Sequence, residues 1–193
     1  MTTYNPPVLA TRILPNTRAA TVVAVIGFAL LTALAAQYVI PLPFTPVPIT
    51  GQTLVVLLAG GVLGSRRGAA SMTLYLAMGA VGLPFFAQAS GGWEVVTGAT
   101  GGYIVGFIAA AWFVGFLAER RQDRAIATSI PAFLTGNAII YLFGVTWLSY
   151  SLNMSAADAL AAGLAPFVIG DAFKVALAGL ALPATWKLFS GNK

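Results

Sequence analysis

Residues 19–40 read AATVVAVIGFALLTALAAQYVI and contain no charged side chain. A helix needs about 20 apolar residues to cross a bilayer, so this stretch is long enough to span a membrane. The segment that follows, residues 41–48, reads PLPFTPVP. Proline lacks a backbone N–H and disfavours helical geometry in the residue before it. The first membrane span is therefore predicted to end at this proline-rich segment.

The composition extends this interpretation to the whole chain of 193 residues. Hydrophobic residues make up 59% of it and charged residues 8%, whereas a typical soluble domain contains about 25% charged residues. So few charges cannot cover a soluble surface, and the basic residues are too scattered to form a nucleic-acid-binding face. The sequence predicts a single all-α integral membrane domain in the lipid bilayer, with no nucleic-acid partner.

The hydropathy pattern predicts six membrane spans, namely residues 19–40, 52–64, 68–86, 101–118, 125–152 and 163–189. The second span is too short to cross unaided, but the distribution of charge supports it. With six spans, nine of the ten basic residues lie on the side that holds both termini, and none lies on the other side. The positive-inside rule then places both termini in the cytoplasm.

The residue inventory argues against an enzyme. The chain contains no Cys and no His, which excludes disulfides, thiolate nucleophiles, His-ligated metals and Ser–His–Asp arrangements. The five acidic residues are dispersed, so a D-D-x-x-D magnesium site is also absent. We expect no catalytic residue, no metal site and no bound cofactor, and an enzyme that acts on lipid is a disfavoured hypothesis.

The external connections are long and rich in Gly, Pro and aromatic residues, and they cover residues 41–51, 84–100 and 151–162. In the last of them, Ser155 and Asp158 are expected to cap a short interfacial helix. Glycines allow close backbone approach and aromatic rings provide flat apolar walls, so the loops are predicted to cap an external ligand pocket. Ordinary turns with interfacial aromatic residues are the alternative. The candidate pocket residues from this argument are Gln52, Gln88 and Trp93.

The strongest single signal is a pair of charges in the last span, Asp171 and Lys174. Their spacing of three positions puts them on one helix face. A charge at the bilayer centre costs about 2.5–3.5 kcal/mol on insertion scales, so such residues are usually functional. The pair either stabilises the bundle as a neutral ion pair or faces a pocket. In a pocket, Asp171 would accept hydrogen bonds from a ligand, and Lys174 would bind an anionic group or keep Asp171 ionised.

Several motifs, in this order and spacing, resemble the BioY family, the biotin-capturing S components of energy-coupling-factor transporters. These motifs are PVPITGQ at 46–52, GSRRG at 64–68, GLP at 82–84 with SGG at 90–92, GATGGY at 98–103 and PFVIGDAFK at 166–174. The resemblance covers residues 20–183. It implies a six-helix S-component bundle with an external biotin pocket, ligand contacts by Asp171 and Lys174, and a pocket wall through Tyr103.

The resemblance also implies partners: a transmembrane coupling protein and two ATPase subunits, in a bacterial or archaeal cytoplasmic membrane. The chain has no Walker A motif, so ATP would be hydrolysed by the partner subunits. Ala29 and Ala33 form a small-residue pair that permits close helix contact, and we predict that they contact the coupling subunit. Contact inside the bundle is the alternative. The competing function is a self-sufficient small transporter or channel with Asp171 as a proton or ion site.

Overall fold

Long helices form the body of the structure, a computed structural model that describes residues 8–190. The longer helices are α2 (Arg18–Ala35), α3 (Gln52–Leu63), α4 (Ser65–Ala80), α6 (Gly101–Glu119), α7 (Ile126–Ser151) and α9 (Val168–Ser190). The shorter elements are α1 (Leu9–Ile13), strands β1 (Val39–Ile40) and β2 (Ile49–Thr50), 3-10 helices η1 (Ala87–Ala89) and η2 (Ala165–Phe167), and helices α5 (Trp93–Thr97) and α8 (Ala156–Gly163). The all-α fold predicted from the sequence is confirmed.

Within residues 8–190, four segments are long and apolar enough to cross a membrane: α2, α6, α7 and residues 156–189, which include α9. The helix α3 is apolar but has only 12 residues. At 1.5 Å per residue it is about 18 Å long, which is less than the roughly 30 Å of a bilayer core. The fold is that of a multi-pass membrane protein, and six crossings stay a prediction.

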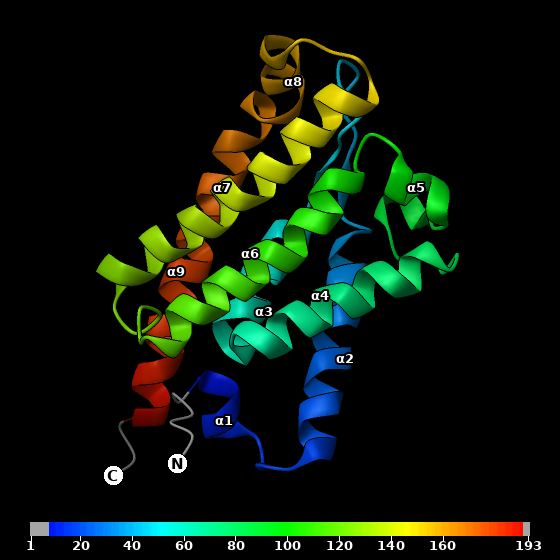
Figure 1. Cartoon of the computed structure of the whole chain (residues 1–193). Helices are drawn as coiled ribbons and strands as arrows, with labels where there is room; N and C mark the ends of the chain where they lie inside the picture. The colour runs from blue at the N-terminus through cyan, green and yellow to red at the C-terminus, as the bar shows by residue number, and fades with distance from the viewer. Residues whose placement is uncertain (1–7, 191–193) are drawn as a thin grey trace.

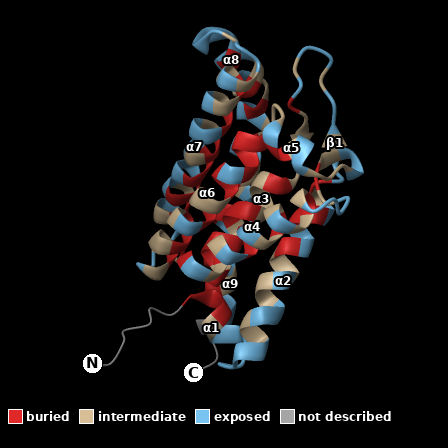
Figure 2. Cartoon of the chain, turned by 45° about the vertical axis from the view of Figure 1, so that its right-hand side comes forward, coloured by how far each residue is buried: buried red, intermediate tan, exposed pale blue. Residues whose placement is uncertain are grey.

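The helix α6 is the centre of the bundle, and it packs against α7, α3 and α4 (Figure 1). Glycines bring it close to α7. A Cβ atom added at Gly102 would lie 2.2 Å from the Cβ atom of Trp147, so only glycine fits between the two backbones. Buried residues run through the interior along these contacts, whereas the outer helix faces are exposed (Figure 2). Exposed apolar faces of this kind suit a lipid environment.

The first predicted span, residues 19–40, is too long. The helix α2 ends at Ala35, and residues 39–40 pair with residues 49–50 as an antiparallel hairpin. The extended pairing of residues 39–40 with 49–50 is incompatible with a helix, and Pro41 disfavours helical geometry in Ile40 directly before it. The helix thus ends five residues before the predicted end of the span, and the chain continues into the hairpin.

Two other boundaries also differ from the prediction. The span predicted at residues 68–86 begins earlier, because the Glu119 carboxylate accepts hydrogen bonds from the Ser65 backbone N–H (2.9 Å) and hydroxyl (2.7 Å). The helix ends at Ala80, just before Gly82, whose φ of 103° breaks the helical geometry. The span predicted at residues 163–189 is interrupted, since α8 ends at Gly163 and α9 begins at Val168.

The short helix predicted near residue 155 is present as α8, and its position at a membrane interface stays a prediction. Its N-cap is Ser155, whose hydroxyl accepts a hydrogen bond from the Asp158 backbone N–H at 3.2 Å. The same hydroxyl donates to the Asp158 carboxylate at 2.6 Å. This reciprocal capping stabilises the first turn of a helix that has only eight residues.

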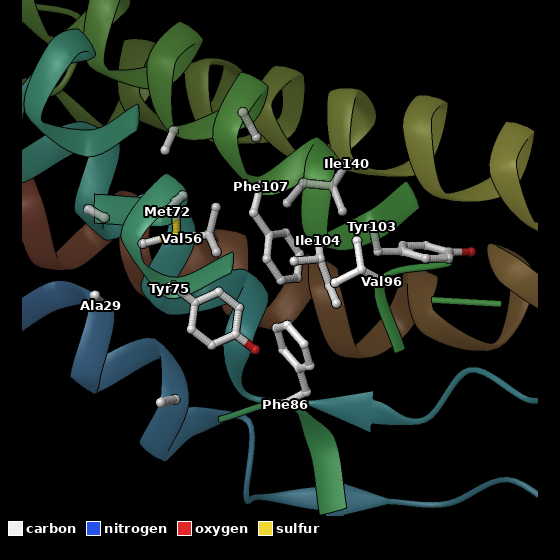
Figure 3. Close-up of a cluster of buried hydrophobic side chains, with 14 of the residues drawn as sticks. Ala29, Val56, Met72, Tyr75, Phe86, Val96, Tyr103, Ile104, Phe107 and Ile140 are labelled. Carbon is white, nitrogen blue, oxygen red and sulfur yellow. The ribbon is translucent and has the colours of Figure 1, made fainter. Parts of the chain in front are cut away.

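The small-residue pair of α2 packs inside the chain. Ala29 has no exposed surface and Ala33 retains 7%, and both belong to the main core cluster, in which Figure 3 labels Ala29. The contact is with α4, where the Ser71 hydroxyl donates to the Val25 carbonyl at 2.8 Å. The prediction that Ala29 and Ala33 contact a coupling subunit is therefore corrected, because both side chains are occupied by contacts within the bundle.

Replacing Ala29 by Phe is expected to lower the thermal stability of the protein. The new ring has no space in the core, and overpacking of this kind costs about 1–3 kcal/mol. Val23 provides a matched control on the same helix, because its side chain is 68% exposed. Thermal unfolding of the Ala29→Phe and Val23→Phe variants in detergent checks the prediction. Equal midpoints for the two would show that the α2–α4 contact does not stabilise the fold.

The two ends of the bundle differ in charge. One end gathers α1, the start of α2, the α6–α7 connection and the end of α9 (Figure 1). Contacts across this end include the Trp186 indole N–H, which donates to the Asp123 carboxylate at 2.5 Å. The described basic residues outside the spans are at this end: Arg12, Arg18, Arg66, Arg67, Arg120, Arg121, Arg124 and Lys187. The hairpin, α5 and α8 lie at the opposite end, where the candidate site is found.

Candidate functional site

A buried ion pair forms the polar part of the site. Asp171 and Lys174 lie in the first turns of α9, and the Lys174 Nζ atom is 2.7 Å from Asp171 Oδ1. Asp171 is 4% exposed. The pair lies three residues apart on one helix face, as the sequence predicts. Because each charge neutralises the other, the ionised pair is tolerated in a largely apolar interior.

Two threonines complete the hydrogen bonds of Lys174. Its ammonium donates to the Thr50 carbonyl at 2.7 Å and to the Thr53 hydroxyl at 3.0 Å, in addition to Asp171. An ammonium has three donors, so these three acceptors use all of them. In this geometry Lys174 holds the carboxylate in place, and its own charge is already paired.

The Asp171 carboxylate, in contrast, does not use all of its hydrogen-bond acceptor sites within the protein. Its Oδ1 atom accepts from Lys174 and, at 3.1 Å, from the Thr53 hydroxyl, whereas its Oδ2 atom accepts from the Tyr141 hydroxyl at 2.6 Å. A carboxylate offers about four acceptor sites, two on each oxygen. Three are used by these bonds, which leaves one site on Oδ2 for a donor from a ligand.

Gln52 starts α3 and is buried beside the ion pair. Its amide Nε2 donates to the Tyr75 hydroxyl at 2.5 Å, and its Oε1 accepts from the Thr50 hydroxyl at 2.8 Å. The Tyr75 hydroxyl in turn donates to the Phe85 carbonyl at 3.3 Å. Gln52 therefore joins α3, α4 and the loop after α4 into one polar network next to the cavity.

Tyr103 forms a wall of the site. Its hydroxyl donates to the Gly163 carbonyl at 2.7 Å, and its ring is almost fully buried. Two glycines provide the space for this side chain. A Cβ atom at Gly144 would lie 2.2 Å from the ring, and one at Gly163 would lie 2.4 Å from the hydroxyl oxygen. The Tyr103 side chain can therefore occupy this place only if positions 144 and 163 are glycine.

These side chains surround a cavity of about 220 Å³ at the hairpin end of the bundle. A single water needs about 10–15 Å³ by this measure, so the cavity has room for a small organic molecule. Apolar side chains make up most of its wall: Val47, Val95, Phe86, Tyr103, Ile104, Phe107, Ile140 and Phe167. Figure 3 shows the ring of Phe86 beside that of Tyr75, in the cluster of buried side chains that also contains Phe107. The ion pair, Thr50, Thr53 and Tyr141 supply the polar contacts.

The structure brings five of the predicted pocket residues into this one cavity: Gln52, Gln88, Tyr103, Asp171 and Lys174. Trp93 does not line it. Its side chain lies on α5, is 64% exposed and borders a separate apolar groove with Trp147 and Tyr150. The loop argument placed Trp93 in the correct region of the chain but could not tell which way its side chain points.

Sequence reasoning missed Thr53, Tyr141, Phe86 and Phe167. Thr53 and Tyr141 bond directly to Asp171, although each is an ordinary residue of a membrane helix. Phe86 lies in the aromatic-rich loop 84–100 and Phe167 in the motif at 166–174, so the sequence marked both segments without singling out these two side chains. A weaker sequence signal exists for Thr53. It directly follows Gln52, a polar residue at the start of an apolar stretch, so the two together mark that helix end as polar.

Comparisons with known proteins agree on one family. The model of the BioY family matches residues 9–191. The biotin transporter BioY of Rhodobacter capsulatus is 41% identical, over 79% of this chain and 85% of that protein. The biotin transporter BioY of Thermotoga maritima is 38% identical, over 73% of this chain and 82% of that protein. The crystal structure of the S-component for biotin from an ECF-type ABC transporter matches with a TM-score of 0.81 and 26% identity, covering 91% of this chain and 95% of that one.

Proposed function

This chain belongs to the BioY family, and we propose that it captures biotin as the substrate-specific subunit of an energy-coupling-factor transporter. One observation carries the proposal. A cavity with apolar walls contains a buried carboxylate that has one unused acceptor site on Oδ2. Biotin combines a ureido ring, which has N–H donors, with an apolar body and a carboxylate tail. The family members compared above are transporters by name, so we assign no catalytic activity to the chain.

The proposed binding mode follows from the polarity of the cavity. A ureido N–H donates to Asp171 Oδ2, and the ring system packs against Phe86, Tyr103 and Phe107. Because its donors are already used, Lys174 acts on the ligand through Asp171, whose carboxylate it holds in place. A charge-assisted hydrogen bond is shorter and stronger than a neutral one, and this favours the ureido ring over a purely apolar ligand.

The basic end of the bundle supports an orientation with both termini in the cytoplasm of a bacterial or archaeal cell, and with the cavity facing outward. The parent has no cysteine, so a single introduced cysteine shows whether its end of the bundle is accessible from outside the cell. Arg66→Cys and Glu94→Cys both lie at exposed positions. An impermeant thiol reagent applied to intact cells is expected to label position 94 and to leave position 66 unlabelled. Labelling at position 66 from outside would contradict this topology and the second span.

The proposed partners are a transmembrane coupling protein and two ATPase subunits. The sequence lacks a Walker A motif, so ATP hydrolysis in the partner subunits would drive uptake, and this chain needs no cofactor of its own. Biotin is the transported ligand. A self-sufficient transporter or channel that uses Asp171 as an ion site is the competing mechanism.

Uptake into proteoliposomes separates the two mechanisms. Vesicles that contain only this chain are expected to bind biotin without accumulating it. Vesicles that also contain the coupling protein and the ATPase subunits are expected to accumulate it when ATP is supplied, and a Walker A lysine variant of the ATPases is the matched control. Accumulation that is equal with and without the partner subunits would contradict the proposal and would favour the self-sufficient mechanism.

A further inference from the structure

One wall of the cavity has a strained backbone. Residues 86–90 form a tight turn after α4, and Phe86, Ala87, Gln88 and Ser90 from this turn line the cavity. Gln88 has a φ of 61° and Ala89 a φ of 53°. Residues other than glycine rarely adopt this left-handed region, and they persist there only where the surroundings hold them. The turn therefore needs contacts that keep it in this conformation.

Some of those contacts lie within the turn. The Phe86 N–H donates to the Ser90 carbonyl at 2.9 Å, and the Ser90 hydroxyl donates to the Ala87 carbonyl at 2.7 Å. These bonds close the turn on itself. They do not attach it to the helices of the bundle, so they cannot keep it pressed against the cavity.

Gln37 provides an attachment to α2, in addition to the contacts that Tyr75 of α4 makes with the Phe85 carbonyl and the Phe86 ring. It lies two residues after the end of α2, and its Nε2 atom donates to the Ala33 carbonyl at 2.9 Å and to the Phe86 carbonyl at 3.2 Å. Its Oε1 atom accepts from the Ala89 N–H at 2.9 Å. One side chain thus ties both halves of the strained turn to the last turn of α2, although Gln37 does not itself line the cavity.

We propose that Gln37 is a positioning residue that holds the turn 86–90 closed against the cavity and thereby slows the release of the bound ligand. The link to the cavity is Phe86, which is 1% exposed and packs edge-on against Tyr75 with 5.5 Å between ring centroids. Movement of the turn would withdraw this ring from the wall. The role in ligand release rests on the proposed function, whereas the restraint on the turn is a property of the free protein.

Hydrogen exchange on the ligand-free protein tests the restraint. In Gln37→Ala, the amides of Phe86 and Ser90 are expected to exchange about tenfold faster than in the parent, because the turn opens when it loses two hydrogen bonds to Gln37. These two amides are informative, since their own acceptors lie within the turn. Gln122→Ala, at the opposite end of the bundle, is the matched control and should exchange as the parent does at these positions. Faster exchange at Ala89 alone would overturn the proposal, because it would show a lost bond without opening.

The dissociation rate of labelled biotin, measured by chase with unlabelled biotin, tests the consequence. Gln37→Ala is expected to release biotin about tenfold faster than the parent and Gln122→Ala. Adding Ala89→Gly to Gln37→Ala should slow release again, because glycine adopts the left-handed conformation without strain. Parental release from a folded Gln37→Ala variant would overturn the inference. A parent that does not bind biotin would instead overturn the proposed function, and the hydrogen exchange of the turn would still decide the role of Gln37.

Discussion

Replacing Asp171 by Asn is expected to weaken biotin binding by roughly ten- to a hundredfold. The carboxylate accepts three hydrogen bonds from the protein and keeps one acceptor site for the ligand. A hydrogen bond to a charged group is worth about 1.5–3 kcal/mol, which corresponds to this loss. The substitution also leaves the Lys174 charge without its partner in a buried site, and this adds to the cost.

Lys174→Ala is expected to cause a loss of similar size, because Asp171 then loses the cation that is paired with its Oδ1 atom and holds it in place. Asp158→Asn and Lys187→Ala are matched controls, since both residues are exposed and lie outside the cavity. All four variants are compared by calorimetric titration with biotin, and thermal unfolding shows that each is folded. A folded Asp171→Asn or Lys174→Ala variant that binds biotin as the parent does would show that the residue only stabilises the bundle.

Replacing Gly102 by Val is expected to prevent the normal packing of α6 on α7. A Cβ atom at this position would lie 2.2 Å from the Trp147 Cβ atom and 2.6 Å from the Phe143 carbonyl oxygen. These atoms cannot move aside as the end of a flexible side chain can, so the helix axes must separate. Overpacking costs about 1–3 kcal/mol and occasionally more. Because Tyr103 follows directly on α6, biotin affinity should fall together with stability.

Gly27→Val is the matched control for this prediction. Gly27 also lies within a helix, but no atom lies within 4 Å of a Cβ added there. The same chemical change should therefore leave the melting temperature and biotin affinity close to those of the parent. If Gly102→Val melted as Gly27→Val does, the close approach of α6 and α7 would not be needed for the fold.

Much of the helix arrangement could be predicted from the sequence, because lipid leaves few alternatives to a helix for an apolar chain. The helices α3, α6 and α7 begin and end within one residue of the predicted stretches. The charges of α9 could also be placed on one face, since three residues make nearly one helical turn. These predictions depend on local periodicity and composition, which a single sequence contains.

The breaks within apolar stretches could not be predicted in the same way. Hydropathy does not distinguish residues 156–189 as one helix from α8 and α9 joined by η2, because all of them are apolar. Backbone that leaves helical geometry is tolerated at membrane depth where it lines a cavity, and Phe167 of η2 lines this one. The position of such a break depends on tertiary contacts.

The contact partners of individual side chains could not be predicted from the sequence either. The pair Ala29 and Ala33 correctly indicated close helix contact, but a small-residue pattern does not say whether the neighbour is α4 or another protein. Thr53 and Tyr141 reach Asp171 from helices that are far apart in the sequence. Only the folded arrangement of α3, α7 and α9 shows that these three residues form one network.

Calorimetric titration of the purified parent protein tests the central claim, that this cavity binds biotin through the ureido ring at Asp171, most directly. Biotin is compared with lipoic acid, which has a similar acid tail and a sulfur-containing ring but no ureido N–H. We expect saturable binding of one biotin per chain, and lipoic acid binding at least tenfold more weakly because it cannot donate to Asp171 Oδ2. Absence of saturable biotin binding by the folded protein, or equal affinity for the two ligands, would contradict the account.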